Sequence, residues 1–143
     1  MKRRTFIAAT IGCATAGIAL ADSSQQVFDL FSKIASALSD DDPAMFVEAL
    51  DPAMPGLQDF RRNLVALTDL ADLTNSLEIL TDTGDDNRRD DQLDWFLEIV
   101  GKSDPHPVER RRETVKFHLE RKGKKWKIMS IDPIKFFAPP KIA

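Results

Sequence analysis

Apolar residues recur at helical spacing through the first half of the chain. Asp42 followed by Pro43 is typical of an N-cap and the first position of a helix, so a short second helix is expected between two longer ones. The two longer stripes, each with apolar residues three or four positions apart, are Val27, Leu30, Phe31, Ile34 and Leu38, then Leu57, Phe60, Leu64, Leu67 and Ala71. The pattern predicts three helices, each with one apolar face.

The spacing of apolar residues changes to two in the second half. Alternation predicts four strands, and Lys122-Gly123 is typical of a two-residue hairpin loop between the last two. With this loop, Leu119 lies opposite Trp126, so both strands turn their apolar residues to one face. The strands are expected at residues 77–83, 92–101, 111–121 and 124–132. The inner face then carries Leu93, Trp95, Leu97, Val115, Phe117, Leu119, Trp126 and Ile128.

The opposite face of this sheet combines charges with apolar residues. Pairing Trp95 with Val115 also places Asp94 opposite Lys116, so opposite charges form a ladder. Apolar residues interrupt the charges at Phe96, Val100, Met129 and Ile131. We expect a homodimer through this outer face. The alternative is that the C-terminal tail covers the same patch in a monomer.

The N-terminus reads as a cleavable export segment. Residues 1–4 are basic after the initial methionine, residues 5–20 are uncharged, and Ala19 and Ala21 are the small residues that precede a cleavage site. The uncharged run is too short for a typical membrane span of about 20 apolar residues, so no stable membrane anchor is expected after cleavage. Arg3-Arg4 resembles a twin-arginine export motif, and both the general and the twin-arginine route remain open.

Cleavage after Ala21 divides the chain into a signal peptide at 1–21, one domain at 22–133 and a C-terminal tail at 134–143. The mature protein would be periplasmic or extracellular. Removal of three basic residues changes the net charge from −3 to −6, which disfavours nucleic acid as a partner. The single cysteine, Cys13, is lost, and the two histidines have no second histidine at ligand spacing. We therefore expect no cofactor and no metal site.

The chain resembles the nuclear transport factor 2-like superfamily, because three predicted helices are followed by a curved antiparallel sheet. The segments that carry the resemblance are residues 42–46, 51–56 and 123–128. The resemblance is to an exported bacterial member. It implies an α+β fold in which three N-terminal helices pack on a curved four-stranded antiparallel sheet to form a cone. Such cones often leave a pocket between the sheet and a long helix, and they often dimerise through the sheet. The superfamily includes isomerases, dehydratases, hydrolases and non-catalytic binders.

The pocket implied by this resemblance would be lined by Phe31, Leu64, Leu93, Trp95, Phe117 and Trp126. The sequence contains no tyrosine, so the pairing of an aspartate base with a tyrosine that some enzymatic relatives use is not available. The inward polar candidates are Arg111, Glu113 and Asp132. The expected registers place Glu113 beside Asp132, where two close carboxylates would form a general acid or base. Alternatively, they are strand-end residues that reach water.

The sequence therefore favours an exported, non-catalytic binding or interaction module with a possible small-molecule pocket. The alternative is a cofactor-independent lyase or isomerase that uses Glu113, Asp132 and Arg111. An interior filled with apolar side chains would favour the binder, and a closed pocket lined by polar groups would favour the enzyme. The basic clusters at 110–112 and 121–125 are expected to form cross-strand ion pairs, with an anionic ligand or lipid headgroup as the alternative.

We predict that the mature protein starts at Asp22, because Ala19 and Ala21 occupy the small-residue positions before the cleavage site. N-terminal sequencing of the exported protein should return Asp22 as the first residue. Recovery of Met1, or of a lipidated Cys13, would contradict this prediction.

Overall fold

The computed structural model describes the backbone of residues 11–141 and the side chains of residues 23–141. Its helices are α1 (Ile11–Ser39), α2 (Pro43–Glu48), α3 (Leu57–Leu70) and the 3-10 helix η1 (Ile134–Phe137). Its strands are β1 (Ala71–Gly84), β2 (Arg88–Gly101), β3 (Val108–Lys122) and β4 (Lys125–Asp132). Residues 1–10 of the expected export segment lie outside the described residues, so cleavage and export stay predictions. None of the described helices is both long and apolar enough to cross a membrane.

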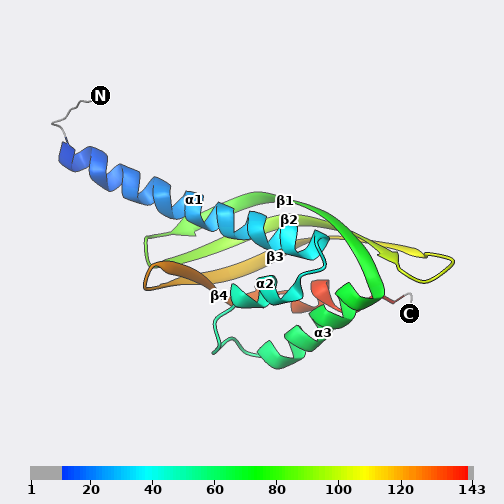
Figure 1. The fold of residues 1–143 in the computed structure, drawn as a ribbon. Coiled ribbons are helices and arrows are strands. Elements are labelled where there is room, and N and C mark those ends of the chain that lie inside the picture. Colours follow the sequence, from blue (N-terminus) through cyan, green and yellow to red (C-terminus); the bar gives the residue numbers. More distant parts are fainter. Residues whose placement is uncertain (1–10, 142–143) are drawn as a thin grey trace, which may run out of the picture.

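The four strands form one antiparallel sheet in the order β1-β2-β3-β4. Figure 1 shows α1 running along the curved sheet, with α2, α3 and η1 grouped beside it. The free edge of β4 is partly covered, because Asp51 donates its N–H to the carbonyl of Ile128 at 2.9 Å and Ile128 donates to that of Ala49. The predicted α+β architecture of three helices on a curved four-stranded antiparallel sheet is confirmed.

The predicted helices form where the apolar spacing placed them. Val27, Phe31 and Ile34 are fully buried on the face of α1 that contacts the sheet, where the ring of Phe31 lies 4.9 Å from that of Phe117. Asp42 caps α2 by accepting a hydrogen bond from the backbone N–H of Met45 at 3.3 Å. Burial of these faces therefore fixes α1 and α2 against one side of the sheet.

The centre of the fold is closed by two aromatic residues from η1. Phe136 and Phe137 are buried, and the ring of Phe137 contacts three aromatic rings from other elements. Its centroid lies 5.2 Å from that of Phe46 on α2, 5.9 Å from that of Phe60 on α3 and 5.3 Å from that of Trp95 on β2. All three contacts have the edge-to-face geometry that aromatic pairs prefer.

The C-terminal segment is held inside by Arg111 on β3. Its guanidinium donates hydrogen bonds to the carbonyl oxygens of Phe136 and Ala138, both at 2.8 Å, and of Pro139 at 3.1 Å. The segment therefore packs on the helix side of the sheet, and the alternative that it covers the outer face is wrong. Dimerisation through the outer face stays a prediction.

The predicted faces of β2 and β3 are confirmed, but their register is wrong by two residues. Leu93 lies opposite Val115, and Trp95 lies opposite Glu113. A shift of two residues keeps every side chain on its face, so the apolar pattern fits both registers equally well. All eight residues predicted for the inner face are buried.

The hairpin between β3 and β4 also differs from the prediction. Lys122 pairs with Lys125, so the loop residues are Gly123 and Lys124, and Leu119 lies opposite Ile128. The register then shifts at a bulge, after which Phe117 lies opposite Ile131. The bulge moves Ile131 to the inner face, where it is buried, and its predicted place on the outer face is wrong.

We predict that Phe137→Ala lowers the free energy of unfolding by about 3 to 5 kcal/mol, because it removes the ring that joins α2, α3 and β2. Chemical denaturation would measure this loss. The matched control is Phe28→Ala, since Phe28 is 46% exposed on α1 and its truncation should change stability by less than about 1 kcal/mol. Equal effects at the two positions would contradict the closing role of Phe137.

Candidate functional site

The interior of the cone is filled with side chains. Of the six residues predicted to line a pocket there, Phe31, Leu64, Leu93, Trp95 and Phe117 are almost completely buried in the core. Phe137 occupies the space beside Trp95. Only Trp126 among the six lines the hollow between α1, α2 and the β3–β4 hairpin. The structure therefore moves the candidate site from the interior to the surface.

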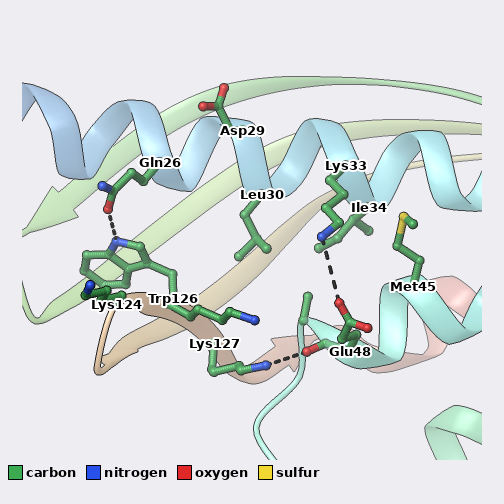
Figure 2. A pocket seen from close by; sticks show the side chains of 12 residues that line it. Gln26, Asp29, Leu30, Lys33, Ile34, Met45, Glu48, Lys124, Trp126 and Lys127 are labelled. Carbon is green, nitrogen blue, oxygen red and sulfur yellow. Dashed lines mark hydrogen bonds and ion pairs between the residues drawn. The ribbon is translucent and has the colours of Figure 1, made fainter.

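This hollow, called here the α1–α2 groove, has a volume of about 370 Å³ (Figure 2). Its apolar lining consists of Leu30, Ile34, Met45, Ala49 and Trp126. Its polar lining consists of Gln26, Asp29, Lys33, Glu48, Lys124, Lys125 and Lys127. Figure 2 shows Leu30 pointing into the space between α1 and β4, whereas Asp29 points away from it. An apolar floor with charged groups at the rim suits an amphipathic ligand.

Trp126 forms a fixed wall of the α1–α2 groove. Its indole N–H donates a hydrogen bond to the side-chain oxygen of Gln26 at 3.1 Å. The guanidinium of Arg121 lies 5.1 Å from the ring centroid, within the range of a cation–π contact. Arg121 is itself held by the carbonyl of Asp86 at 2.8 Å. These contacts tie α1 to the end of the hairpin.

The lysines at the rim differ in how they are used. Lys127 donates to the backbone carbonyl of Glu48 at 2.6 Å, and the ammonium of Lys33 lies 3.9 Å from the Glu48 carboxylate. Both therefore hold α2 in place. Lys124 and Lys125 form no ion pair with any residue whose side chain the structure describes. These two lysines are available to an anionic group in the groove.

The predicted acid–base residues do not come together. Asp132 lies opposite Lys116 on the outer face, whereas Glu113 lies opposite Trp95, so the β4 bulge puts the two carboxylates on different faces. Arg111 donates to Glu109 at 2.7 Å as well as to the C-terminal carbonyls. The predicted side-by-side placement of Glu113 and Asp132 is therefore wrong.

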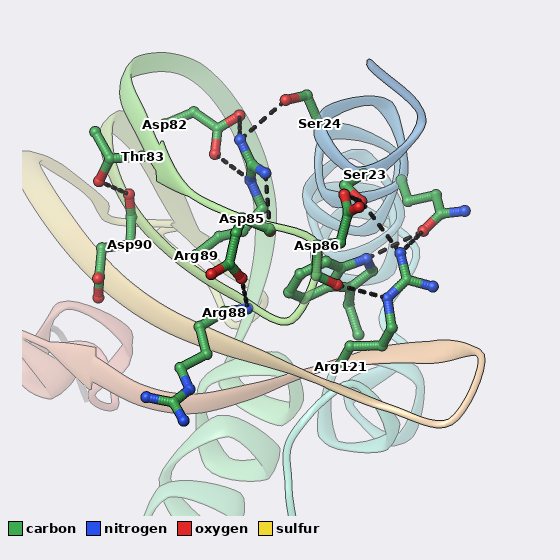
Figure 3. A network of polar contacts seen from close by, with 12 residues as sticks. Ser23, Ser24, Asp82, Thr83, Asp85, Asp86, Arg88, Arg89, Asp90 and Arg121 are labelled. Carbon is green, nitrogen blue, oxygen red and sulfur yellow. Dashed lines mark hydrogen bonds and ion pairs between the residues drawn. The ribbon is translucent and has the colours of Figure 1, made fainter. Parts of the chain in front are cut away.

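A buried polar cluster that the sequence did not predict joins the middle of α1 to the β1–β2 hairpin (Figure 3). Arg89 donates to both carboxylate oxygens of Asp82, at 2.7 and 3.0 Å, and to the hydroxyl of Ser24 at 3.0 Å. Asp91 lies directly opposite Asp82 and is 1% exposed, yet no donor from the described residues reaches its oxygens. Alternation alone could have found it, since Asp91 continues the inner-face series of Leu93 and Trp95.

The two carboxyl groups of this cluster share one proton. Burial, then the hydrogen bond and negative charge of Asp82, raise the pKa of Asp91 to about 8. Burial is also the largest single effect on Asp82, but its hydrogen bonds with Arg89, Asp91 and Ser24, together with the charge of Arg89, outweigh burial and hold the pKa of Asp82 below its ordinary value. A protonated Asp91 can donate to Asp82, which satisfies a group that would otherwise have no partner. Asp91 is buried but borders a hollow of about 450 Å³ beside Phe117, and the Asp82 side chain is 21% exposed. The contacts from Arg89 to Ser24 and Asp82 tie α1 to the β1–β2 hairpin.

The outer face carries ion pairs and a histidine between two carboxylates. His118 lies 2.8 Å from Asp90 and 3.1 Å from Glu120, and the hydrogen bond with Asp90 contributes most to raising its pKa. Arg112 pairs with Asp94 at 2.8 Å, and Arg110 pairs with Glu98. Within the described part of the chain, no three histidine, cysteine or acidic side chains are arranged to hold a metal ion. The cluster at 110–112 is thus used within the protein.

No protein-family model matches this sequence, and no curated protein sequence matches it. Solved structures do. A conserved protein from Planctomyces limnophilus has a TM-score of 0.71 at 8% identity, over 77% of this chain and 93% of that one. A nuclear transport factor 2-like superfamily protein from Salmonella enterica serovar Typhimurium has a TM-score of 0.62 at 12% identity, over 86% and 95%.

A hexachlorocyclohexane dehydrochlorinase from Novosphingobium barchaimii is also similar, with a TM-score of 0.65 at 12% identity, over 80% of this chain and 87% of that one. At these identities the likeness concerns the fold. The chain therefore has the nuclear transport factor 2-like fold, as the resemblance in its sequence implied.

We predict that Asp91→Asn removes a pH dependence of stability. Asp91 has a folded-state pKa near 8, above its unfolded value of about 3.9, so folding takes up a proton between these values and stability is lost as the pH rises through them. Asparagine does not titrate. As the pH rises, the unfolding free energy of the variant should increase relative to that of the unmodified protein by up to about 1.4 kcal/mol per pH unit. This relative change should level off near pH 8.

Urea denaturation of both proteins between pH 5 and pH 9 measures this difference and cancels the titration of the other groups. Asp69→Asn is the matched control, because it removes an exposed carboxylate on α3 outside the cluster. A difference that does not change with pH for Asp91→Asn would mean that Asp91 is ionised in the folded protein.

Proposed function

We propose that this protein is an exported, non-catalytic binding module whose ligand occupies the α1–α2 groove. The observation that supports this most strongly is the filled interior. Phe136 and Phe137 take up the space between the helices and the sheet, so a substrate cannot enter there without displacing them.

The groove has the features that a binding site needs. Its volume of about 370 Å³ is within the usual range for small-molecule sites, and Leu30, Ile34 and Met45 offer an apolar floor. Its walls are held by the Trp126–Gln26 hydrogen bond and by contacts from lysines to α2. A preformed site of this kind loses little conformational entropy on binding.

The alternative function is a small cofactor-independent lyase or isomerase. Two solved structures of the same fold are dehydrochlorinases, so the architecture can support such chemistry in other proteins. In this chain Glu113 and Asp132 are on different faces, and Arg111 binds the C-terminal segment. The predicted pair of Glu113 and Asp132 is therefore not available around a shared substrate, and this favours the binding module.

We predict that the groove binds 8-anilinonaphthalene-1-sulfonate, whose rings suit its apolar floor and whose sulfonate suits its lysines. Met45 is 38% exposed in the groove, so Met45→Glu places a negative charge on the floor and should weaken binding at least tenfold. Fluorescence titration measures this. Val65→Glu is the matched control, because Val65 is 40% exposed on α3 and does not line the groove.

The bound dye should also shift the NMR signal of the Trp126 indole N–H and leave that of the buried Trp95 unchanged. Equal affinity of the two glutamate variants, or no shift at Trp126, would contradict the assignment of the groove as the binding site.

A further inference from the structure

The two ends of the α1–α2 groove differ chemically. Lys124 lies at the hairpin end, next to Trp126, and Met45 lies at the other end, on α2 (Figure 2). Lys125, between Lys124 and Trp126 in the sequence, also lines the groove. Gly123, with a φ of +66°, allows the tight turn that presents the two lysines one after the other. A ligand lying along the groove therefore meets positive charge at one end and apolar surface over the rest.

The charge at the hairpin end is not cancelled by the protein. Glu48 is engaged by Lys33 and lies on α2, whereas Asp29 points away from the groove and accepts a hydrogen bond from Gln25. Neither acid forms an ion pair with Lys124 or Lys125. A negative group would therefore be attracted to these lysines, and a positive group would be repelled.

The groups available at this end suit a head group with a single charge. Arg121, which could bind a phosphate in two places, is already bound to Asp86 and Ser23 and stacked on Trp126. The two lysines act as flexible point charges at a solvated rim. Among the described residues that line this end, no guanidinium is therefore free to bind a phosphate in two places, and a carboxylate, which needs only point charges, suits this end of the groove better.

On the premise of the proposed function, we infer that the ligand of the α1–α2 groove is an amphipathic monocarboxylate, such as a medium-chain fatty acid. Its carboxylate lies between Lys124 and Lys125, and its hydrocarbon chain covers Trp126, Leu30, Ile34 and Met45. Each buried methylene should raise the affinity about fourfold, and the lysines should add a contribution that depends on ionic strength.

The test uses the mature protein with octanoate, decanoate, decan-1-ol and decylamine, and follows the Trp126 indole N–H and the Met45 methyl by NMR. Decanoate should bind about fifteenfold more tightly than octanoate. Decanol should bind more weakly than decanoate, and decylamine should bind most weakly. Lys124→Ala/Lys125→Ala should weaken decanoate binding about three- to tenfold and leave decanol binding unchanged.

The matched control is Lys116→Ala/Lys122→Ala, which removes two lysines of β3 that do not line the groove and should leave decanoate binding unchanged. If decanol binds as tightly as decanoate and shifts the Trp126 signal, the inference of a carboxylate head group is wrong, but the groove is still supported as the binding site. If none of the ligands, nor the naphthalene dye, shifts Trp126, the proposed function fails as well. Binding only to phosphatidylglycerol vesicles, without monomeric decanoate, would overturn the inference in favour of a membrane surface.

Discussion

Burial of the Phe137 ring is the contact on which the rest of the structure depends. This one side chain touches α2, α3 and β2, and Arg111 holds the backbone around it through three carbonyl groups. An aromatic ring buries about 150 to 250 Å² and packs at interior density, so the cone has no room for a guest molecule. The α1–α2 groove, which combines an apolar floor with charged groups at its rim, lies outside the core, between α1, α2 and the hairpin.

Much of the fold could be predicted from the sequence, because periodicity reports which face a side chain occupies. The buried stripe of α1 and the Asp42 cap follow from local spacing and chemistry, and the inner faces of β2 and β3 follow from alternation. Register does not follow in the same way. A shift of two residues in the pairing preserves alternation. The bulge in β4 adds one residue to the strand, and alternation does not predict its position. For this reason Ile131 and Asp132 were assigned to the wrong faces.

The candidate site was less predictable than the fold, because it depends on which elements meet. Alternation placed Trp126 on the inner face, and the family resemblance implied a pocket there. Its groove partners Met45 and Lys33 come from helices whose packing on β4 the spacing does not specify. The polar cluster was missed for a different reason. Asp91 stands in a run of charged residues that resembles a loop, although its position matches the buried parity of Leu93.

The large sequence separation between the closing aromatic residues and the first core residue has a consequence for folding. Phe136 and Phe137 complete a core that begins with Val27. Contacts of such large sequence separation form slowly, because the loop-closure entropy must be overcome before the packing is gained. The core is therefore expected to close late in folding, after neighbouring strands and helices have formed their contacts.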